Sequence, residues 1–245
     1  MTRRLDWDGL LNGRDLGGLP TTGGGRTRRG AVVRSEALDH LTAAGWDALL
    51  AHGVRTVLAL TPEDEPDLAP RPAELDTVRV PLDERAGDAF QQRWSGPVSG
   101  TPLYYPAYLR EHPEAIAEAV GALARARPGG VLVHCAGGRD RTGLVVLVLL
   151  AFAGVGAADI VADYRETERT RAAVTARFGM PDDSAPLDEF LAGRGTSVEA
   201  SLRAALAGFD AAELLRAGGL TPDDLAALRA RLLDPDPVNL VSSGG

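Results

Sequence analysis

The sequence predicts an α/β protein with a mostly parallel central sheet flanked by helices and a helical extension at its C-terminal end. Three observations support this fold class. Short aliphatic runs alternate with helical patterns over the first two thirds of the chain. A glycine-containing cationic loop separates one such run from an apolar helix. The last third is helical throughout, and strands that alternate with helices indicate a parallel sheet covered on both faces.

The predicted strands are runs of β-branched and aliphatic residues, namely Ala31–Arg34, Val54–Leu60, Thr77–Pro81 and Val131–His134. Between the first two strands, Thr42 is placed to cap a helix and Gly53 to end it. Three further helices are expected at His112–Arg127, Thr142–Phe152 and Asp159–Arg177. The second of these is apolar on all sides, which is typical of a helix buried in the core.

Residues 197–233 form the expected helical extension, and Thr221 to Asp224 resemble a capping box with Asp in place of Glu. We expect residues 1–245 to form a single domain on which this extension packs. Residues 21–30, 95–102 and the tail after Asp234 are rich in Gly, Pro, Ser and Thr and are expected to be loops.

Composition excludes several classes of function. Hydrophobic residues make up 44% and charged residues 24% of the 245, as in an ordinary globular protein. The net charge of −8 gives no basic field for a nucleic acid polymer or an anionic membrane. The single cysteine excludes an internal disulfide and a multi-cysteine metal site. Without a signal peptide or an apolar run longer than about half a membrane span, a soluble, cytoplasmic protein with no stable membrane insertion is expected.

The only cysteine, Cys135, lies in the stretch HCAGGRDRTG between a predicted strand and a predicted helix. Successive backbone N–H groups in such a turn, together with the helix N-terminus, form an anion site. The same positive field favours the thiolate over the thiol. Gly137 and Gly138 allow the backbone to turn its amides inward. The stretch therefore predicts a nucleophile beside a phosphate-binding loop.

Three neighbouring side chains suit the same chemistry. Arg141 follows the cysteine by six positions and can hold two phosphate oxygens with its planar guanidinium. Thr142 can donate a hydrogen bond to the sulfur, and His134 can orient the loop from behind. A lone buried cysteine is commonly just a small core residue, but the strand, the glycines and the apolar helix around this one favour chemistry.

The loop resembles the signature of the protein tyrosine phosphatase superfamily, HC-x5-R-[ST]. More narrowly, it is similar to that of the bacterial tyrosine and lipid phosphatases, HC-x-x-GKDRTG. Further similar segments lie along the chain, namely residues 12–18 (N-x-R-D-x-GG), residues 34–38 (RS-x-x-L), residues 54–57 with Glu65, Asp163-Tyr164 and the C-terminal LTPDDLAALRARLL. The resemblance implies a tyrosine-phosphatase-like fold.

The resemblance also implies a role for each residue of the loop. Cys135 would be the nucleophile and form a phosphocysteine intermediate. Arg141 would bind the phosphoryl group together with the amides of residues 136–141, which include Ala136. Asp140 would be the general acid that protonates the leaving oxygen. No metal and no organic cofactor are implied.

The chain departs from the family pattern in two places. Arg139 stands where the family has lysine, in a chain whose 26 basic residues are all arginine. It keeps the positive charge but presents a planar fork, which leaves its effect on the choice of substrate open. Ala59-Leu60-Thr61 stands where the family commonly has DLR, so a usual supporting arginine is absent.

Other residues are weaker candidates. Asp83, after a predicted strand, is a rival general acid or else a solvated turn residue. Arg14 and Asp15 are expected to brace the loop, unless they only form a turn. The aromatic residues Trp94, Tyr104, Tyr105 and Tyr108 are expected in the core, although they could line an entrance for an aromatic substrate.

The sequence thus favours a cysteine-dependent phosphomonoesterase acting on phosphotyrosine-like esters. One alternative is a phosphatase for a small metabolite, such as a nucleotide or sugar phosphate of a biosynthetic pathway. Another is a rhodanese-like sulfurtransferase, which also places a cysteine in an anion-binding loop, but the sequence Asp140-Arg141-Thr142 argues against it. A non-catalytic phosphate-binding module would not need the nucleophile. The sequence does not define the oligomeric state or the pathway.

Overall fold

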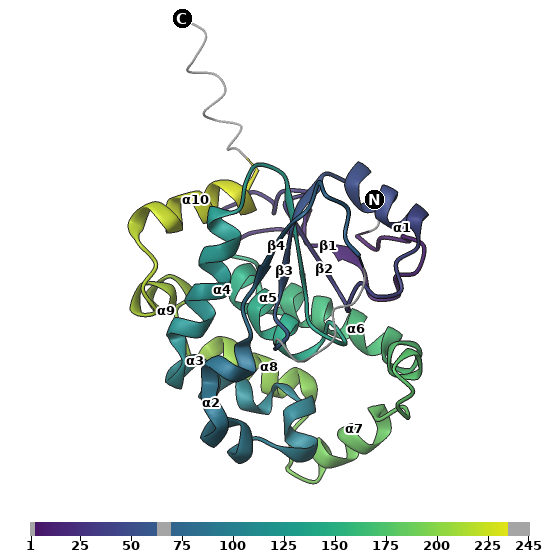
Figure 1. Cartoon of the computed structure of the whole chain (residues 1–245). Coiled ribbons are helices and arrows are strands. Elements are labelled where there is room, and N and C mark those ends of the chain that lie inside the picture. Colours follow the sequence, from purple (N-terminus) through teal and green to yellow (C-terminus); the bar gives the residue numbers. More distant parts are fainter. Residues whose placement is uncertain (1–2, 63–69, 235–245) are drawn as a thin grey trace, which may run out of the picture.

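A five-stranded sheet runs through the centre of the molecule (Figure 1). The computed structural model describes residues 3–62 and 70–234, so Glu65 and the tail beyond Asp234 lie outside it. The strand order is β1-β2-β5-β3-β4, and all pairs are parallel except the edge pair β1–β2. The strands are β1 Arg14–Asp15, β2 Val32–Ser35, β3 Val54–Ala59, β4 Asp76–Arg79 and β5 Gly130–His134.

Strand β5 lies at the centre of the sheet and is buried along its whole length. Ser35 of β2 and Ala59 of β3 both lie in register with His134, its last residue. Three parallel strands therefore end together at one edge, and the chain leaves β5 there to form the cysteine loop. Binding sites in open α/β sheets lie at this carboxyl edge.

The structure confirms the four predicted strands to within one or two residues at each end. The helices are α1 Ala43–Ala51, α2 Leu82–Arg93, α3 Tyr105–Glu111, α4 Pro113–Arg125, α5 Asp140–Phe152, α6 Ala157–Arg177, α7 Ser184–Ala192, α8 Val198–Ala207, α9 Ala211–Ala217 and α10 Pro222–Leu232. As predicted, Thr42 caps α1 by accepting a hydrogen bond from the N–H of Gly45. Helix α4 begins at Pro113, one residue after the predicted start. Helix α5 is buried on nearly all sides.

The sheet separates two apolar cores. Leu132 packs into the core on the side of α1, whereas Val131 and Val133 face the larger core formed with α4 and α5. Because neighbouring residues of a strand face opposite sides, a strand between two covered faces is apolar throughout. Each fully buried aliphatic side chain contributes about 1.5–3 kcal/mol to the stability of the fold. This packing therefore fixes β5, the strand from which the cysteine loop begins.

The last three helices join the larger core. Leu202 of α8, Leu215 of α9 and Leu228 of α10 are fully buried in it, and α10 packs against α4 (Figure 1). The predicted capping box is present, because Thr221 Oγ1 accepts from the N–H of Asp224 at 3.1 Å and the carboxylate accepts from the N–H of Thr221 at 3.1 Å. These contacts support the proposal that residues 1–245 form one domain with 197–233 as an extension.

Some elements were not expected from the sequence. They are β1, α2, α3, α7 and two 3-10 turns, Gly96–Gly100 and Pro102–Tyr104, the first of which lies in the predicted loop 95–102. Helix α2 is interrupted at Gly87, whose φ of 74° is left-handed. Among the described residues, none of the helices has both the length and the apolarity needed to cross a membrane.

Candidate active site

The cysteine loop is a tight turn between the central strand and the buried helix α5. Cys135 directly follows β5 and is only 3% exposed, and α5 begins at Asp140. The N–H of Ala37 donates to the carbonyl of Ala136 at 2.8 Å, which attaches the loop to the segment after β2. The loop thus lies at the carboxyl edge of the sheet, with the N-terminus of a 13-residue helix pointing toward it.

The backbone amides of this loop form a set of donors. Within the described part of the chain, the N–H groups of residues 136–140 donate no hydrogen bond to another residue, and no side chain caps α5. Five consecutive N–H groups at a helix N-terminus form a site for an anion, because the helix dipole adds positive charge there.

The two glycines of the loop differ in what the backbone requires of them. Gly138 has a left-handed φ of 65°, and a Cβ on it would lie 2.2 Å from the carbonyl oxygen of Ser35. Gly137 is not among the residues of positive φ, and a Cβ there would meet no atom within 4 Å. The turn therefore needs glycine at position 138, whereas the expectation that Gly137 serves the same purpose is wrong.

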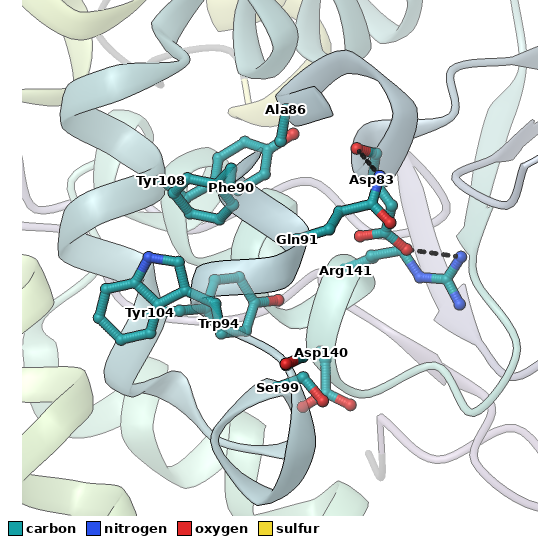
Figure 2. A pocket seen from close by; sticks show the side chains of 11 residues that line it. Asp83, Ala86, Phe90, Gln91, Trp94, Ser99, Tyr104, Tyr108, Asp140 and Arg141 are labelled. Carbon is teal, nitrogen blue, oxygen red and sulfur yellow. Dashed lines mark hydrogen bonds and ion pairs between the residues drawn. The ribbon is translucent and has the colours of Figure 1, made fainter. Parts of the chain in front are cut away.

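A pocket opens beside the loop (Figure 2). Its volume is about 310 Å³, and its lining includes the aromatic residues Phe90, Trp94, Tyr104 and Tyr108, the carboxylates of Asp83 and Asp140, and Arg141. Tyr104 and Tyr108 are buried, with less than 10% of their surface exposed. The expectation that these tyrosines belong to the core holds, but the alternative placement at an entrance holds as well, since their rings form one wall of the pocket.

The pocket holds both candidate acids. Asp83, in the first turn of α2, has Oδ2 3.3 Å from Nη1 of Arg141. Asp140, in the first turn of α5, has Oδ1 3.4 Å from Nη2 of Arg139, and its backbone carbonyl accepts from the hydroxyl of Tyr105 at 2.8 Å. Burial and these two carboxylates raise the pKa of Tyr104 well above its usual value, so its hydroxyl stays protonated.

The side chain of Arg139 is turned into the protein. It is 8% exposed, its Nε donates to the hydroxyl of Tyr164 at 3.3 Å, and it does not line the pocket. Burial lowers the pKa of Arg139, but Asp140 and Tyr164 outweigh burial and raise it above its usual value. Arg139 therefore keeps its charge beside Asp140, and only its backbone N–H belongs to the row of loop donors.

Behind the loop lies a buried ionic cluster centred on Asp163 of α6. Its carboxylate contacts Nη1 of Arg3 at 2.7 Å, Nε of Arg14 at 3.1 Å and Nη1 of Arg34 at 2.8 Å. Burial alone would raise the pKa of Asp163, but the three arginines hold it well below its usual range. Burial and the neighbouring Arg34 lower the pKa of Arg14 to about 10.

The cluster touches the loop from outside. Arg34 Nη2 donates to the carbonyl of Gly138 at 2.8 Å. Arg14 Nη1 donates to Oδ1 of Asn12 at 2.6 Å, and the amide of Asn12 donates to the carbonyl of Gly137 at 3.2 Å. Arg14 is thus connected to the loop through Asn12.

The remaining candidates lie apart from these contacts. Asp15 accepts from the N–H groups of Gly17 and Gly30 and lies 3.4 Å from Nε2 of His52, so the expectation that it braces the loop is wrong. His134 is fully buried, with Nδ1 3.2 Å from the carbonyl oxygen of Cys135. Thr142 is buried too, and its hydroxyl has no hydrogen-bond partner among the described residues.

Sequence reasoning missed Asn12 and Asp163 as residues of the loop's surroundings. A signal for Asp163 was present, because in the predicted helix Asp159–Arg177 it lies close to the apolar residues Val161 and Tyr164, which are buried with it. A carboxylate on a buried face needs cationic partners. Asn12 makes its contacts across 125 positions of sequence, and no local pattern indicates them.

Comparison with known proteins decides the family. Residues 5–234 match the model of the tyrosine phosphatase family. The chain belongs to the tyrosine phosphatase family. The phosphatase is 32% identical over 244 residues to a Cupriavidus necator protein named "Putative tyrosine-protein phosphatase". The alignment covers 94% of this chain and 88% of that protein. It is also 32% identical over 160 residues to a tyrosine-protein phosphatase of Nostoc commune, covering 63% of this chain and 52% of the other.

Family membership makes the phosphatase a phosphoric monoester hydrolase with a phosphate ester as its substrate. The α/β fold with a mostly parallel five-stranded sheet agrees with it. Both relatives carry the name of a tyrosine-protein phosphatase and neither that of a sulfurtransferase, so the comparisons favour the phosphatase interpretation over the rhodanese-like one.

Proposed function

We propose that the protein hydrolyses phosphate monoesters through a phosphocysteine intermediate formed on Cys135. The Cys135 thiolate attacks phosphorus, the S–P bond forms and the P–O ester bond breaks. Asp140 gives its proton to the departing oxygen, which leaves as an alcohol or phenol. Arg141 and the loop amides hold the phosphoryl oxygens, whose charge they stabilise throughout.

In the second step water takes the place of the leaving group. The Asp140 carboxylate accepts a proton from that water as its oxygen attacks phosphorus, and the S–P bond breaks to return the thiolate. The products are inorganic phosphate and the regenerated acid, so protons and electrons balance over the cycle. The same carboxyl group acts as acid and then as base.

One observation carries this proposal: five consecutive loop N–H groups without a partner in the described chain follow directly on the only cysteine. Backbone donors without a partner are costly where they are buried, and Gly138 and Arg139 of this turn are buried. A phosphoryl group has the acceptor oxygens that such a row of donors requires. The guanidinium of Arg141 at the adjoining pocket supplies a bidentate cation for the same group.

We assign the acid to Asp140 rather than Asp83 for a geometric reason. The carboxylate of Asp83 contacts Arg141, the residue that the phosphoryl group has to engage. Asp140 contacts Arg139, whose side chain points away from the pocket, so substrate binding does not compete for its partner. Both acids line the same pocket, and the comparison of leaving groups described below separates them.

For the substrate, we propose an aryl phosphate of the phosphotyrosine type. The pocket beside the loop has four aromatic side chains and a volume of about 310 Å³, which suits an aromatic ring but leaves little room for a large headgroup. The metabolite alternative, a nucleotide or sugar phosphate, would make less use of this aromatic wall.

We also propose that the protein is cytoplasmic, because a lone free cysteine suits a reducing compartment.

The test compares kcat/KM on a phosphotyrosine peptide, phosphoserine peptide, phosphoinositide, nucleotide monophosphate and sugar phosphate. The proposal expects the phosphotyrosine peptide to be the best substrate and Cys135→Ser to abolish turnover while retaining phosphate binding. Higher kcat/KM on a nucleotide or sugar phosphate would overturn the aryl assignment. Full activity of Cys135→Ser would overturn the covalent mechanism.

A further inference from the structure

We propose that Asp163 is a positioning residue for phosphate binding. It holds two arginines whose contacts turn the carbonyls of Gly137 and Gly138 outward and thereby direct the next two N–H groups toward the substrate phosphate. The proposal rests on the function proposed above, since it requires that the loop binds a phosphoryl group. Asp163 itself does not line the pocket and acts only through other side chains.

Asp163 is suited to this role by the number of donors it collects. Oδ1 accepts from Nη1 of Arg3 at 2.7 Å and from Nε of Arg14 at 3.1 Å. Oδ2 accepts from Nη1 of Arg34 at 2.8 Å and from Nη2 of Arg14 at 3.3 Å. The carboxylate is completely buried, so these hydrogen bonds are shielded from water. They fix the guanidinium planes of Arg14 and Arg34.

The fixed arginines reach the loop by two routes. In the direct route, Arg34 donates from Nη2 to the carbonyl of Gly138 at 2.8 Å. In the indirect route, Arg14 holds Oδ1 of Asn12 at 2.6 Å, which turns the amide nitrogen of Asn12 toward the loop. That nitrogen donates to the carbonyl of Gly137 at 3.2 Å and lies 3.5 Å from that of Gly138.

Because of peptide geometry, a carbonyl that is held outward fixes the next N–H group in the inward direction. In a planar trans peptide the C=O and the following N–H point in opposite directions. Holding the carbonyl of Gly137 outward therefore directs the N–H of Gly138 inward, and holding that of Gly138 does the same for the N–H of Arg139. Both N–H groups belong to the set without a partner in the described structure.

The charge of the cluster makes the proposal testable, because positioning and electrostatics predict opposite changes in anion affinity when Asp163 is replaced. Three arginines surround one carboxylate, so the cluster carries a net charge of about +2 behind the loop. Replacing Asp163 with asparagine raises that charge by one unit, and electrostatics alone would tighten the binding of an anion. Loss of positioning has the opposite effect, because the carbonyls are no longer held and the donors lose their alignment.

The experiment measures the Kd of orthovanadate and of inorganic phosphate for wild type, Asp163→Asn and Asn12→Ala. We expect both variants to weaken vanadate binding by about tenfold or more, as small misplacements at a site do. We also expect kcat/KM to fall by the same factor for aryl phosphates of high and low leaving-group pKa. A purely structural role would not predict this pattern in variants that remain folded.

Thr27→Val is the matched control for stability. Thr27 is buried, its hydroxyl makes two backbone hydrogen bonds, to Leu16 and from Leu19, and neither involves the loop. It should lower the unfolding temperature and leave vanadate binding unchanged. Tighter or unchanged vanadate binding in folded Asp163→Asn and Asn12→Ala would overturn the proposal, and if Asp163→Asn does not fold, Asn12→Ala decides. Failure of the wild type to bind vanadate would instead overturn the proposed function.

Discussion

The guanidinium of Arg141 lies 3.3 Å from the carboxylate of Asp83, across the pocket beside the cysteine loop. This contact joins the first turn of α5 to the first turn of α2. It places a negative charge next to the arginine that we assign to the phosphoryl group. Asp83 is 44% exposed at its side chain, so the interaction is partly screened by water.

Replacing Asp83 with asparagine should tighten phosphate binding. The phosphoryl group competes with this carboxylate for Arg141, and a partly exposed pair of this kind contributes about 0.5–1 kcal/mol, or roughly a two- to fivefold change in Kd. Titration with inorganic phosphate measures the effect. Weaker binding in Asp83→Asn would show that Asp83 positions Arg141 rather than competing with the substrate.

Replacing Asp140 with alanine should slow the hydrolysis of phosphate esters with poor leaving groups most. An alkoxide or phenoxide of high pKa needs a proton as it leaves, and general acids contribute about 10²–10⁴-fold. We therefore expect a loss in this range for phenyl phosphate and a much smaller one for p-nitrophenyl phosphate. Plots of log kcat/KM against leaving-group pKa measure this, and a steeper slope in Asp83→Ala but not in Asp140→Ala would reverse our assignment.

Replacing Gly138 with alanine should destabilise the loop, whereas the same change at Gly137 should not. At Gly138 a methyl group would approach the carbonyl oxygen of Ser35 to 2.2 Å in a left-handed conformation. Strain of this kind costs about 1–3 kcal/mol before the steric clash is added. Chemical unfolding of the two variants checks the contrast, which would be refuted by equal free energies of unfolding.

Replacing Asp163 with asparagine should destabilise the protein in a pH-dependent way. Removing one partner of a buried ion pair costs about 3–5 kcal/mol near neutral pH. The folded-state pKa of Asp163 is held well below its usual value of 3.8. Its contribution to stability is therefore present above pH 4 and is lost as the pH falls below 4 toward the folded-state pKa.

Urea unfolding of wild type and Asp163→Asn at a series of pH values measures this difference. The gap in free energy of unfolding should be constant above pH 5 and should narrow as the pH drops below 4. A gap that widens on acidification, or none at pH 7, would contradict the ionic role assigned to Asp163.

Local patterns in the sequence were sufficient to predict the centre of the fold. Strands β2, β3 and β5 are buried along almost their whole length and are rich in aliphatic residues, and α5 is apolar after its first turn, so packing and propensity agree there. Helix α2 was missed although Leu82, Ala86 and Phe90 recur at helical spacing, because Gly87 interrupts a short and polar segment. Strand β1 has only two residues, and pairing across the sheet defines it.

The sequence predicts only those parts of the site whose residues lie close together along the chain. Cys135 and Arg141 fall within seven consecutive residues, and their types indicate their use. The direction of Arg139, the exclusion of Asp15 from the loop and the approach of Asn12 depend on how distant segments pack. The aromatic wall of the pocket likewise forms only when Phe90 of α2 and Tyr108 of α3 come together, with their ring centroids 5.3 Å apart (Figure 2).

The central claim is that Cys135 carries the phosphoryl group during turnover. Mass spectrometry of a reaction with an aryl phosphate, quenched rapidly in acid and digested, tests it directly. The account predicts that the peptide containing Cys135 gains the mass of one phosphoryl group during turnover, and that Cys135→Ser neither turns over nor shows this gain. Full turnover without any phosphorylated Cys135, or an unimpaired Cys135→Ser variant, would contradict it.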